Sequence, residues 1–313
     1  AVRLDGRERT LLSFPADVSL LDIAADGQAL MARHDRIDET KIFLPGEGRE
    51  REVSWLDGAF PAYISNDGKT LLLSHRGEGS GPSFSVYLQD IEEKSTVLLG
   101  EGIALCISPD DQWVASIVRG AKDRILLLPT GAGRVRSYEL DLYVTTVSFF
   151  PDGRRLAVAG HETGRPNRCY MLDMANGALR PITPEGISCA MLKSAVSPDG
   201  KLVLGRDDSR SAALYPVGGG PPRKIPLQPA DRFLGWDITG QGLFTTQGRA
   251  GFGWPIYRLD VATGRRELWK EIEPTDRTGN PQLLRIHLTP DGRTYVYSTE
   301  RTISKLYLVE GLE

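Results

Sequence analysis

Short clusters that combine histidine, arginine and acidic side chains recur along this chain, and they are its best candidates for chemistry. Histidine titrates near neutral pH, carboxylates can bind cations, and arginine holds anionic groups through paired N–H donors. The clusters comprise His34, Asp35, His75, Arg76, Arg119, His161, Glu162, Asp207, Asp208, Arg249, Glu300 and Arg301. They are far apart in the sequence, so they can act together only if the fold gathers them in one place.

Known catalytic motifs are missing from the sequence. Gly68-Lys69-Thr70 resembles the end of a phosphate-binding loop, but Tyr63 stands where that loop needs its first glycine. His34-Asp35-Arg36 has the residue types of a kinase catalytic loop in the wrong order, and the sequence contains no Asp-Phe-Gly. Neither a Gly-x-Ser-x-Gly elbow nor a His-Glu-x-x-His zinc motif occurs. We therefore expect a domain that binds a ligand without catalysing a reaction, and we expect no cofactor.

One turn sequence, close to Pro-Asp-Gly-Lys/Arg, recurs through the chain between apolar stretches. Such a turn is a strong hairpin signal, because glycine accepts the positive φ that the turn needs. The copies are Ala25-Asp26-Gly27, Asn66-Asp67-Gly68-Lys69, Pro109-Asp110-Asp111, Pro151-Asp152-Gly153-Arg154, Pro198-Asp199-Gly200-Lys201, the divergent Ile238-Thr239-Gly240 and Pro290-Asp291-Gly292-Arg293. The aspartates of the first five copies are 41 to 47 residues apart. This period is typical of a four-stranded propeller blade.

The seven copies predict an all-β chain: a seven-bladed β-propeller of four-stranded antiparallel blades, forming one domain over residues 1–313. A helical fold is excluded because the 34 glycines and 20 prolines interrupt nearly every stretch that is long enough for an ordinary helix. We expect the Asp-Gly turns to join the two innermost strands of each blade. These turns are interpreted as structural.

The last repeat is incomplete, and this predicts how the ring closes. After Pro290-Asp291-Gly292 the sequence supplies two more strands but not the final one. Arg7–Phe14 has the amphipathic pattern of the expected outer strands Arg51–Trp55 and Arg265–Trp269. We expect this N-terminal strand to pair into the C-terminal blade, because closure removes open sheet edges. Ala1–Gly6 resembles the end of another repeat, so we expect the chain to be a fragment of a longer protein.

A ring of blades would bring the polar clusters together, because each cluster follows the second strand of its unit. Loops in that position share one rim around the central channel, and such a mouth is a common binding site. Trp254 lies in a glycine-flanked loop of the same kind and could stack on a ligand. Two alternatives are that these groups are simply solvated or paired with one another, and that His161-Glu162 and Asp207-Asp208 hold a cation.

Composition restricts the partners. The net charge is −3, and no long basic run occurs, which argues against nucleic-acid binding. No apolar run approaches the ~20 residues that span a bilayer, so we expect no direct membrane insertion of this domain. Cys106, Cys169 and Cys189 are odd in number and lack metal-site spacing, and we interpret them as small buried side chains. We expect the isolated domain to be a monomer.

The Asp-Gly turns and the Val/Ile-Tyr-Leu strands resemble TolB-type, or WD-like, propeller repeats over all seven units. A second resemblance, to the C-terminal propeller region of bacterial serine/threonine protein kinases, is spread over most of the chain. It is carried by Ser54–Asp57, Ser65–Leu72, Gly77–Gly79 with Val86–Leu88, Leu127–Gly133 and Leu306–Leu312. In that family a kinase domain and usually one transmembrane helix precede the repeats. The resemblance therefore implies an extracytoplasmic, periplasmic sensor region of a membrane-anchored kinase.

Three functions are compatible with these features. The first is a sensor that binds a small molecule, or a protein or peptide, at the channel mouth. The second is a TolB-like scaffold for protein–protein contact without a small ligand. The third is a propeller hydrolase or lyase whose catalytic residues come together only in space. The absence of catalytic motifs favours the first two.

Overall fold

The computed structural model describes residues 17–54, 56, 58–76, 84–189, 194–248, 253–274 and 276–310. The regular elements in this part of the chain are β-strands, and none of its segments is a helix long and apolar enough to cross a bilayer. The chain divides into two compact units. The larger unit comprises Glu39–Glu273 and Leu283–Ser298, and the smaller comprises Ala1–Asp38, Pro274–Gln282 and Thr299–Glu313.

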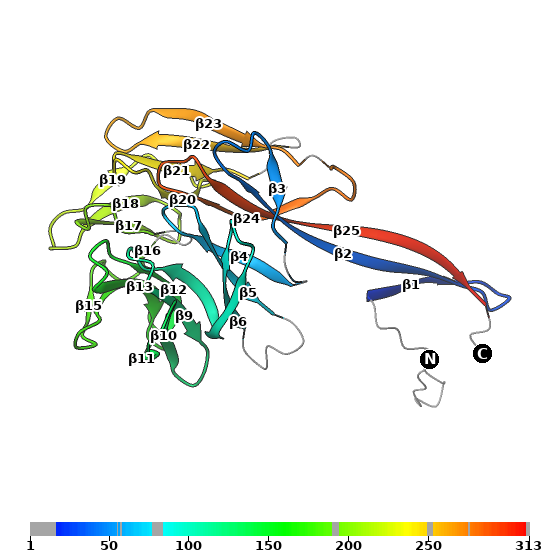
Figure 1. Cartoon of the computed structure of the whole chain (residues 1–313), viewed down its shortest axis with the longest axis horizontal. Coiled ribbons are helices and arrows are strands. Elements are labelled where there is room, and N and C mark those ends of the chain that lie inside the picture. The colour runs from blue at the N-terminus through cyan, green and yellow to red at the C-terminus, as the bar shows by residue number, and fades with distance from the viewer. Residues whose placement is uncertain are drawn as a thin grey trace. The chain divides into compact units, whose positions relative to one another are not determined.

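Five four-stranded antiparallel sheets follow one another along the larger unit, from cyan to orange in Figure 1. In each sheet the strands are neighbours in chain order, without any crossover. The first sheet contains β4 (Ala59–Ile64), β5 (Thr70–His75), β6 (Ser85–Asp90) and β7 (Thr96–Glu101), and the second contains β8 (Ile103–Ile107), β9 (Trp113–Val118), β10 (Asp123–Pro129) and β11 (Arg136–Leu140). The third contains β12 (Tyr143–Phe149), β13 (Arg155–His161), β14 (Arg168–Asp173) and β15 (Leu179–Pro181), the fourth β16 (Ser188–Cys189), β17 (Leu202–Arg206), β18 (Ala212–Pro216) and β19 (Arg223–Ile225), and the fifth β20 (Arg232–Trp236), β21 (Gly242–Thr246), β22 (Trp254–Asp260) and β23 (Arg266–Ile272). Each sheet is therefore a simple up-and-down meander.

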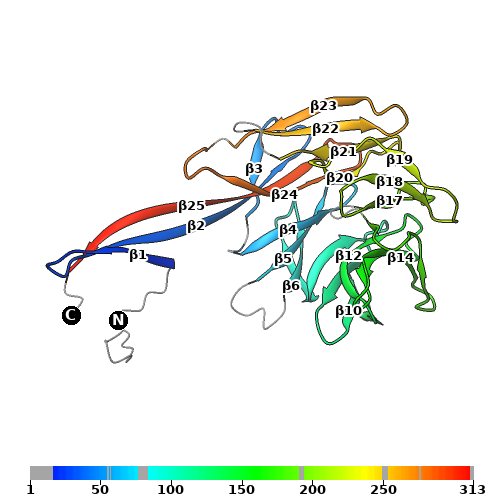
Figure 2. The same ribbon diagram turned by 180° about the vertical axis from the view of Figure 1, so that it is seen from behind.

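The sixth sheet joins the two ends of the chain. It contains β24 (Gln282–Leu288) and β25 (Tyr295–Val309) from the C-terminal part, and β2 (Ala29–Phe43) and β3 (Glu50–Glu52) from the N-terminal part. Figure 2 shows β2 and β25 side by side. The prediction that N-terminal and C-terminal strands close the fold is confirmed, but the N-terminal strands are β2 and β3. The predicted closing strand, Arg7–Phe14, lies outside the described residues.

The described residues form six sheets, not the seven blades expected from the turn count. The first Asp-Gly copy, at Asp26-Gly27, joins β1 (Asp17–Ile23) to β2. These two strands do not begin a sheet of their own, because β2 pairs with β25 of the last repeat. The local turn signal is genuine, but the partner of β2 lies at the other end of the chain.

The core lies between neighbouring sheets. The second strand of each of the five four-stranded sheets is buried along most of its length, as in β5, β9 and β21. Successive side chains of a strand point to opposite faces of the sheet, and each of these sheets packs on both faces. The side chains on both faces must therefore be apolar or hydrogen-bonded within the protein. Closure of the larger unit also shows in one contact between its first and last sheets, where His287 Nε2 lies 3.2 Å from the carbonyl oxygen of Pro61.

Five of the seven recurring turns are held by a hydroxyl–carboxylate bond, whereas the Pro151 copy has Phe150 in place of the hydroxyl and its Asp152 accepts from Arg155. The hydroxyls of Ser65, Ser108, Ser197 and Thr289 donate to the aspartates two residues later, at 2.7, 2.5, 2.6 and 2.5 Å respectively. The divergent copy keeps the bond with the two residue types exchanged, since Thr239 donates to Asp237 at 2.8 Å. The hydrogen bond from Ser197 and the backbone N–H of Lys201 hold the pKa of the Asp199 carboxyl below its usual value.

Replacing Ser197 by alanine is expected to lower the free energy of unfolding by about 1–2 kcal/mol at pH 7. The hydroxyl donates to Asp199 at 2.6 Å and accepts the Leu202 N–H at 3.0 Å. Because the pKa of Asp199 is lowered on folding, this stabilisation is present above about pH 4 and disappears as the pH falls further. Urea titrations at pH 7 and pH 3 measure it. Ser137→Ala, at an exposed position of β11, is the control, and an equal loss at both pH values would contradict the assignment.

A disulfide joins two neighbouring sheets. Cys169 in β14 is bonded to Cys189 in β16, with the two Cα atoms 5.1 Å apart, and both residues are buried. The prediction that all three cysteines are simple buried side chains is therefore wrong for these two. The pairing could not be predicted from the sequence, because the two cysteines are 20 residues apart and only the packing of β14 beside β16 brings them together. Cys106 is free and buried, as expected.

The smaller unit contains β1 with adjoining parts of β2 and β25. β1 pairs antiparallel with β2, with a register shift between Leu20 and Asp22. Leu20, Ile23 and Leu308 are each more than half exposed, so this unit presents apolar side chains to solvent.

Candidate functional site

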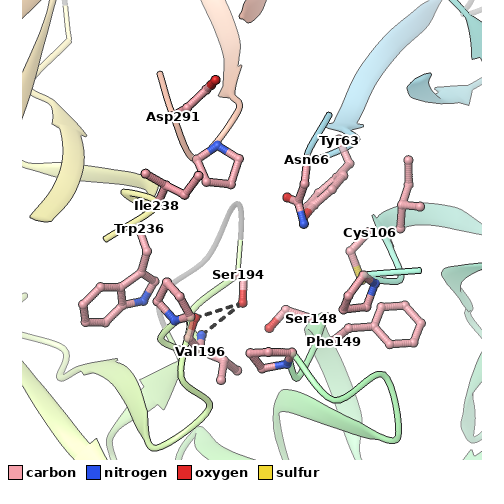
Figure 3. A pocket seen from close by; sticks show the side chains of 15 residues that line it. Tyr63, Asn66, Cys106, Ser148, Phe149, Ser194, Val196, Trp236, Ile238 and Asp291 are labelled. Carbon is pink, nitrogen blue, oxygen red and sulfur yellow. Dashed lines mark hydrogen bonds between the residues drawn. The ribbon is translucent and has the colours of Figure 1, made fainter. Parts of the chain in front are cut away.

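A cavity of about 390 Å³ lies in the larger unit, where the turns of all six sheets converge (Figure 3). Each sheet contributes the residue that precedes the Asp or Thr of its recurring turn. These residues are Asn66, Pro109, Pro151, Pro198, Ile238 and Pro290. Because they occupy equivalent positions in a repeated turn, the repeat itself builds the rim of the cavity.

The ends of the innermost strands form the walls. Tyr63 of β4, Cys106 of β8, Phe149 of β12 and Trp236 of β20 all line the cavity and are largely buried. Val196, just before the turn of the fourth sheet, completes the apolar wall. The arrangement has the character of a small-molecule or side-chain site, because such sites are concave and mostly apolar with a few polar groups.

Polar groups are few, and most are already engaged. The Ser194 hydroxyl lies 3.2 Å from both the N and the O atom of Val196, and the Trp236 indole N–H donates to the Ala195 carbonyl at 3.3 Å. The Ser148 hydroxyl has no hydrogen-bond partner among the described residues, and Ser148 is only 6% exposed. Ser148 and the exposed side chain of Asn66 are therefore the groups most able to bond with a ligand.

The cavity is nearly free of charge. Burial raises the pKa of the Cys106 thiol to about 12, so the thiol is neutral at physiological pH. Asp291 is the one carboxylate among the described lining residues, and Thr289 and the Arg293 N–H already hydrogen-bond to it. None of the lining residues that the structure describes is lysine, arginine or histidine. The site therefore favours an uncharged ligand.

Four of the sequence-predicted site residues lie in the smaller unit. His34 and Asp35 are in β2, and Glu300 and Arg301 are in β25. His34 bridges three strands, because Nδ1 lies 2.8 Å from the Ser304 hydroxyl and Nε2 lies 3.1 Å from the Ser19 hydroxyl. Each of the other three has an ion-pair partner. Asp35 pairs with Arg33 at 2.7 Å, Glu300 with Arg36, and Arg301 with Asp276.

The other described members lie in the larger unit, and none of them lines the cavity. His75 is buried at the end of β5 with its ring against Tyr87. Arg76 lies over the ring of Phe84, 5.7 Å from its centroid. Arg119 pairs with the buried carboxylate of Asp123 at 2.5 Å and stacks on Tyr143.

The remaining polar members make local contacts. The Nδ1 atom of His161 lies 3.2 Å from the Asn167 side-chain oxygen, and Glu162 lies 3.8 Å from Arg165. Asp207 accepts hydrogen bonds from Ser209 and from the Ser211 N–H, while Asp208 is exposed. No group of three or more His, Cys, Asp or Glu residues that could hold a metal ion occurs within the described ranges.

Trp254 is not an exposed loop aromatic. It begins β22, is 2% exposed and belongs to the cluster that contains Phe244 and Ile256. The glycines around it suggested a loop, but β22 pairs with both β21 and β23 and takes the indole into the core. Arg249 lies outside the described residues.

The residues that line the cavity were not predicted from the sequence. The sequence predicts that the Asp-Gly turns are structural, and their aspartates do bond within the turns, but Asp291 also lines the cavity. The available signal was the position just before each aspartate, which is apolar in five of the six copies. This signal is weak, because four of the five apolar residues are prolines and proline is common in turns for its fixed φ.

Comparisons with known proteins support the fold alone. No protein-family model and no curated protein matches the chain. Among solved structures, a protein described as TolB from Agrobacterium tumefaciens superposes with a TM-score of 0.58 at 20% identity, covering 86% of this chain and 99% of that one. The β-propeller domain of the Trilobed protease from Pyrococcus furiosus, whose topology is described as an open velcro, gives a TM-score of 0.55 at 14% identity, covering 96% and 95%.

An oligogalacturonate lyase from Vibrio parahaemolyticus is similar as well, with a TM-score of 0.55 at 17% identity, covering 82% of this chain and 77% of that one. The matches thus include TolB proteins and enzymes alike. At these identities they establish a TolB-like β-propeller fold and leave the function to be inferred from the site.

Proposed function

We propose that this chain is a non-catalytic propeller that binds an uncharged, largely apolar ligand in the cavity between its six recurring turns. The single observation that carries the proposal is that every sheet contributes one turn residue to the same cavity. A site built on the ends of six sheets is held rigidly, so a ligand need not order it on binding.

The lining suggests which ligand would fit. A cavity of about 390 Å³ falls in the range of ligand sites, and its prolines and aromatic side chains offer flat apolar surfaces. The hydroxyl of Ser148 and the amide of Asn66 could pair with a carbonyl or an N–H group. An aromatic or aliphatic side chain of an extended peptide segment satisfies both requirements, as does a small apolar molecule with one amide.

The disulfide supports a location outside the cytoplasm. Disulfides form and persist in oxidising compartments such as the periplasm. An extracytoplasmic sensor region of a membrane-anchored serine/threonine kinase is consistent with this location, and that assignment rests on the sequence resemblance alone. A TolB-like role in protein–protein contact would use the same cavity for a segment of the partner.

The chemistry of the cavity favours binding over catalysis. Its serine and cysteine candidates for a nucleophile, Ser148, Ser194 and Cys106, have no histidine or lysine among the described lining residues to activate them. The raised pKa of Cys106 keeps its thiol neutral, which is the opposite of what a nucleophilic cysteine needs.

Filling the cavity is expected to abolish ligand binding. Capped tri- and tetrapeptide amides rich in Phe, Trp, Leu and Pro are titrated while Trp236 fluorescence is recorded, since its indole lines the cavity. Ser148→Phe is expected to raise the Kd of any binding peptide at least tenfold by occupying the space. Ser137→Phe on exposed β11 is the matched control. A peptide that binds Ser148→Phe as tightly as the wild type would place the ligand elsewhere.

A further inference from the structure

A second cluster in the larger unit combines arginine and phenylalanine side chains from its first and last sheets. Arg285 in β24 stacks over the ring of Phe60 in β4, 4.5 Å from its centroid. Phe60 meets Phe84 edge to face at 6.0 Å, and Arg76 lies over Phe84 at 5.7 Å. Two guanidinium groups thus stack on one pair of aromatic rings.

Arg232, at the start of β20, adds a third positive charge near this cluster. Burial lowers the pKa of Arg285, and the charge of Arg232 lowers it further, so the two guanidinium groups repel each other. β20 and β24 are equivalent strands of neighbouring sheets, which places the two side chains along the inner strands. Neither arginine lines the cavity described above.

Among the described residues, these arginines lack the buried carboxylate partner that three other arginines of the larger unit have. Arg119, Arg258 and Arg266 each pair with a buried aspartate within 2.9 Å. Within the described ranges, neither Arg285 nor Arg232 nor Arg76 has an ion-pair partner. Arg285 is half-buried, whereas Arg76 and Arg232 are exposed. A half-buried cation that faces another positive charge without a counter-charge is unfavourable, and an anion would relieve that cost. Stacking on Phe60 leaves the N–H edge of Arg285 available, and that edge fits the paired oxygens of a carboxylate or phosphate.

We propose that Arg285 and Arg232, with the Arg76–Phe84–Phe60 stack beside them, form an anion site for a ligand that carries a carboxylate or phosphate group. This site is separate from the apolar cavity and would take a different part of a ligand, or a different ligand. The phenylalanine rings fix the guanidinium groups of Arg285 and Arg76, so the order required for binding is already present in the fold.

The test measures the melting temperature of the whole chain in sodium phosphate and in sodium glutarate, with sodium chloride keeping the ionic strength constant. The expected result is a saturating rise of the melting temperature with at least one of the two oxyanions. Arg285→Gln and Arg232→Gln are expected to raise the apparent Kd at least tenfold. Arg136→Gln, which removes an arginine that stacks on Trp113, should leave it unchanged and controls for net charge.

The two anions also distinguish the ligand class, because a preference for phosphate or for glutarate identifies the group that the site holds. Arg232 is exposed and makes no stacking contact with any described residue, so its variant separates loss of binding from loss of folding. Kosmotropic salts stabilise proteins without binding to a site, but that rise does not saturate and is equal in all variants. The same response in the wild type and both arginine variants, or no saturating response to either anion up to 20 mM (roughly twenty times a millimolar Kd), would overturn the proposal.

Discussion

Replacing Glu50 by alanine is expected to lower the free energy of unfolding by about 3–4 kcal/mol, well above the loss of about 1 kcal/mol that a typical single substitution causes. The two carboxylate oxygens of Glu50 accept the hydroxyls of Tyr295 at 2.7 Å and of Tyr297 at 2.6 Å. Both tyrosines are 1% exposed. The substitution leaves two buried donors without a partner, and each costs about 1–3 kcal/mol.

The position of these bonds explains why the effect should be so large. Glu50 lies in β3 and the tyrosines in β25, so the bonds cross the sheet that joins the N-terminal and C-terminal strands. Burial and the bonds to Glu50 raise the pKa of both tyrosines, which keeps them protonated donors. Because the folded-state values are raised, this stabilisation is present below about pH 10 and is lost as the pH rises further.

Guanidinium titrations followed by tryptophan fluorescence measure the effect of Glu50→Ala. Glu50→Gln keeps one acceptor and is expected to lose about half as much. Glu52→Ala, on the same strand and exposed, is the matched control and is expected to be neutral. If Glu50→Ala and Glu52→Ala unfold at the same denaturant concentration, the tyrosine bonds do not hold the closing sheet together.

Reduction of the Cys169–Cys189 disulfide is expected to cost about 3 kcal/mol of stability, from the entropy that a cross-link closing a loop of 20 residues removes from the unfolded chain. The bond ties β14 to β16, and β16 is the shortest innermost strand in the described part of the larger unit, with two residues. Fewer backbone pairs hold this strand in place, so the cross-link should matter more here than at a full-length strand.

Denaturation with and without dithiothreitol tests this expectation, and the double variant Cys169→Ala/Cys189→Ala should match the reduced protein. Cys106→Ala serves as the control, because it removes the free thiol and keeps the disulfide. An identical unfolding midpoint for oxidised and reduced protein would show that the bond contributes nothing to folding.

Much of the fold could be predicted because its signals are local. A turn such as Ser197–Lys201 contains its own hydroxyl, carboxylate and glycine, so the five residues specify the hairpin wherever they occur. The copies at Asn66 to Pro290 each mark a sheet for the same reason. The candidate site was harder to predict, because the polar loop clusters were predicted as the site from their residue types alone. Their members make local pairs or lie in the smaller unit, while the cavity is lined by prolines and inner-strand ends.

The all-β class and the hairpin turns follow from the amino-acid order, because periodicity and turn chemistry act over a few residues. The incomplete last repeat predicts that the two ends close the fold, but it does not specify which strands pair. The pairing of β2 with β25, the bond between Cys169 and Cys189 and the cavity enclosed by six turns emerge only when the sheets pack. These features depend on contacts between residues far apart in the chain. Two hairpins with the same local sequence signal can differ in their partners, since strand pairing is set by which apolar faces meet after the sheets pack.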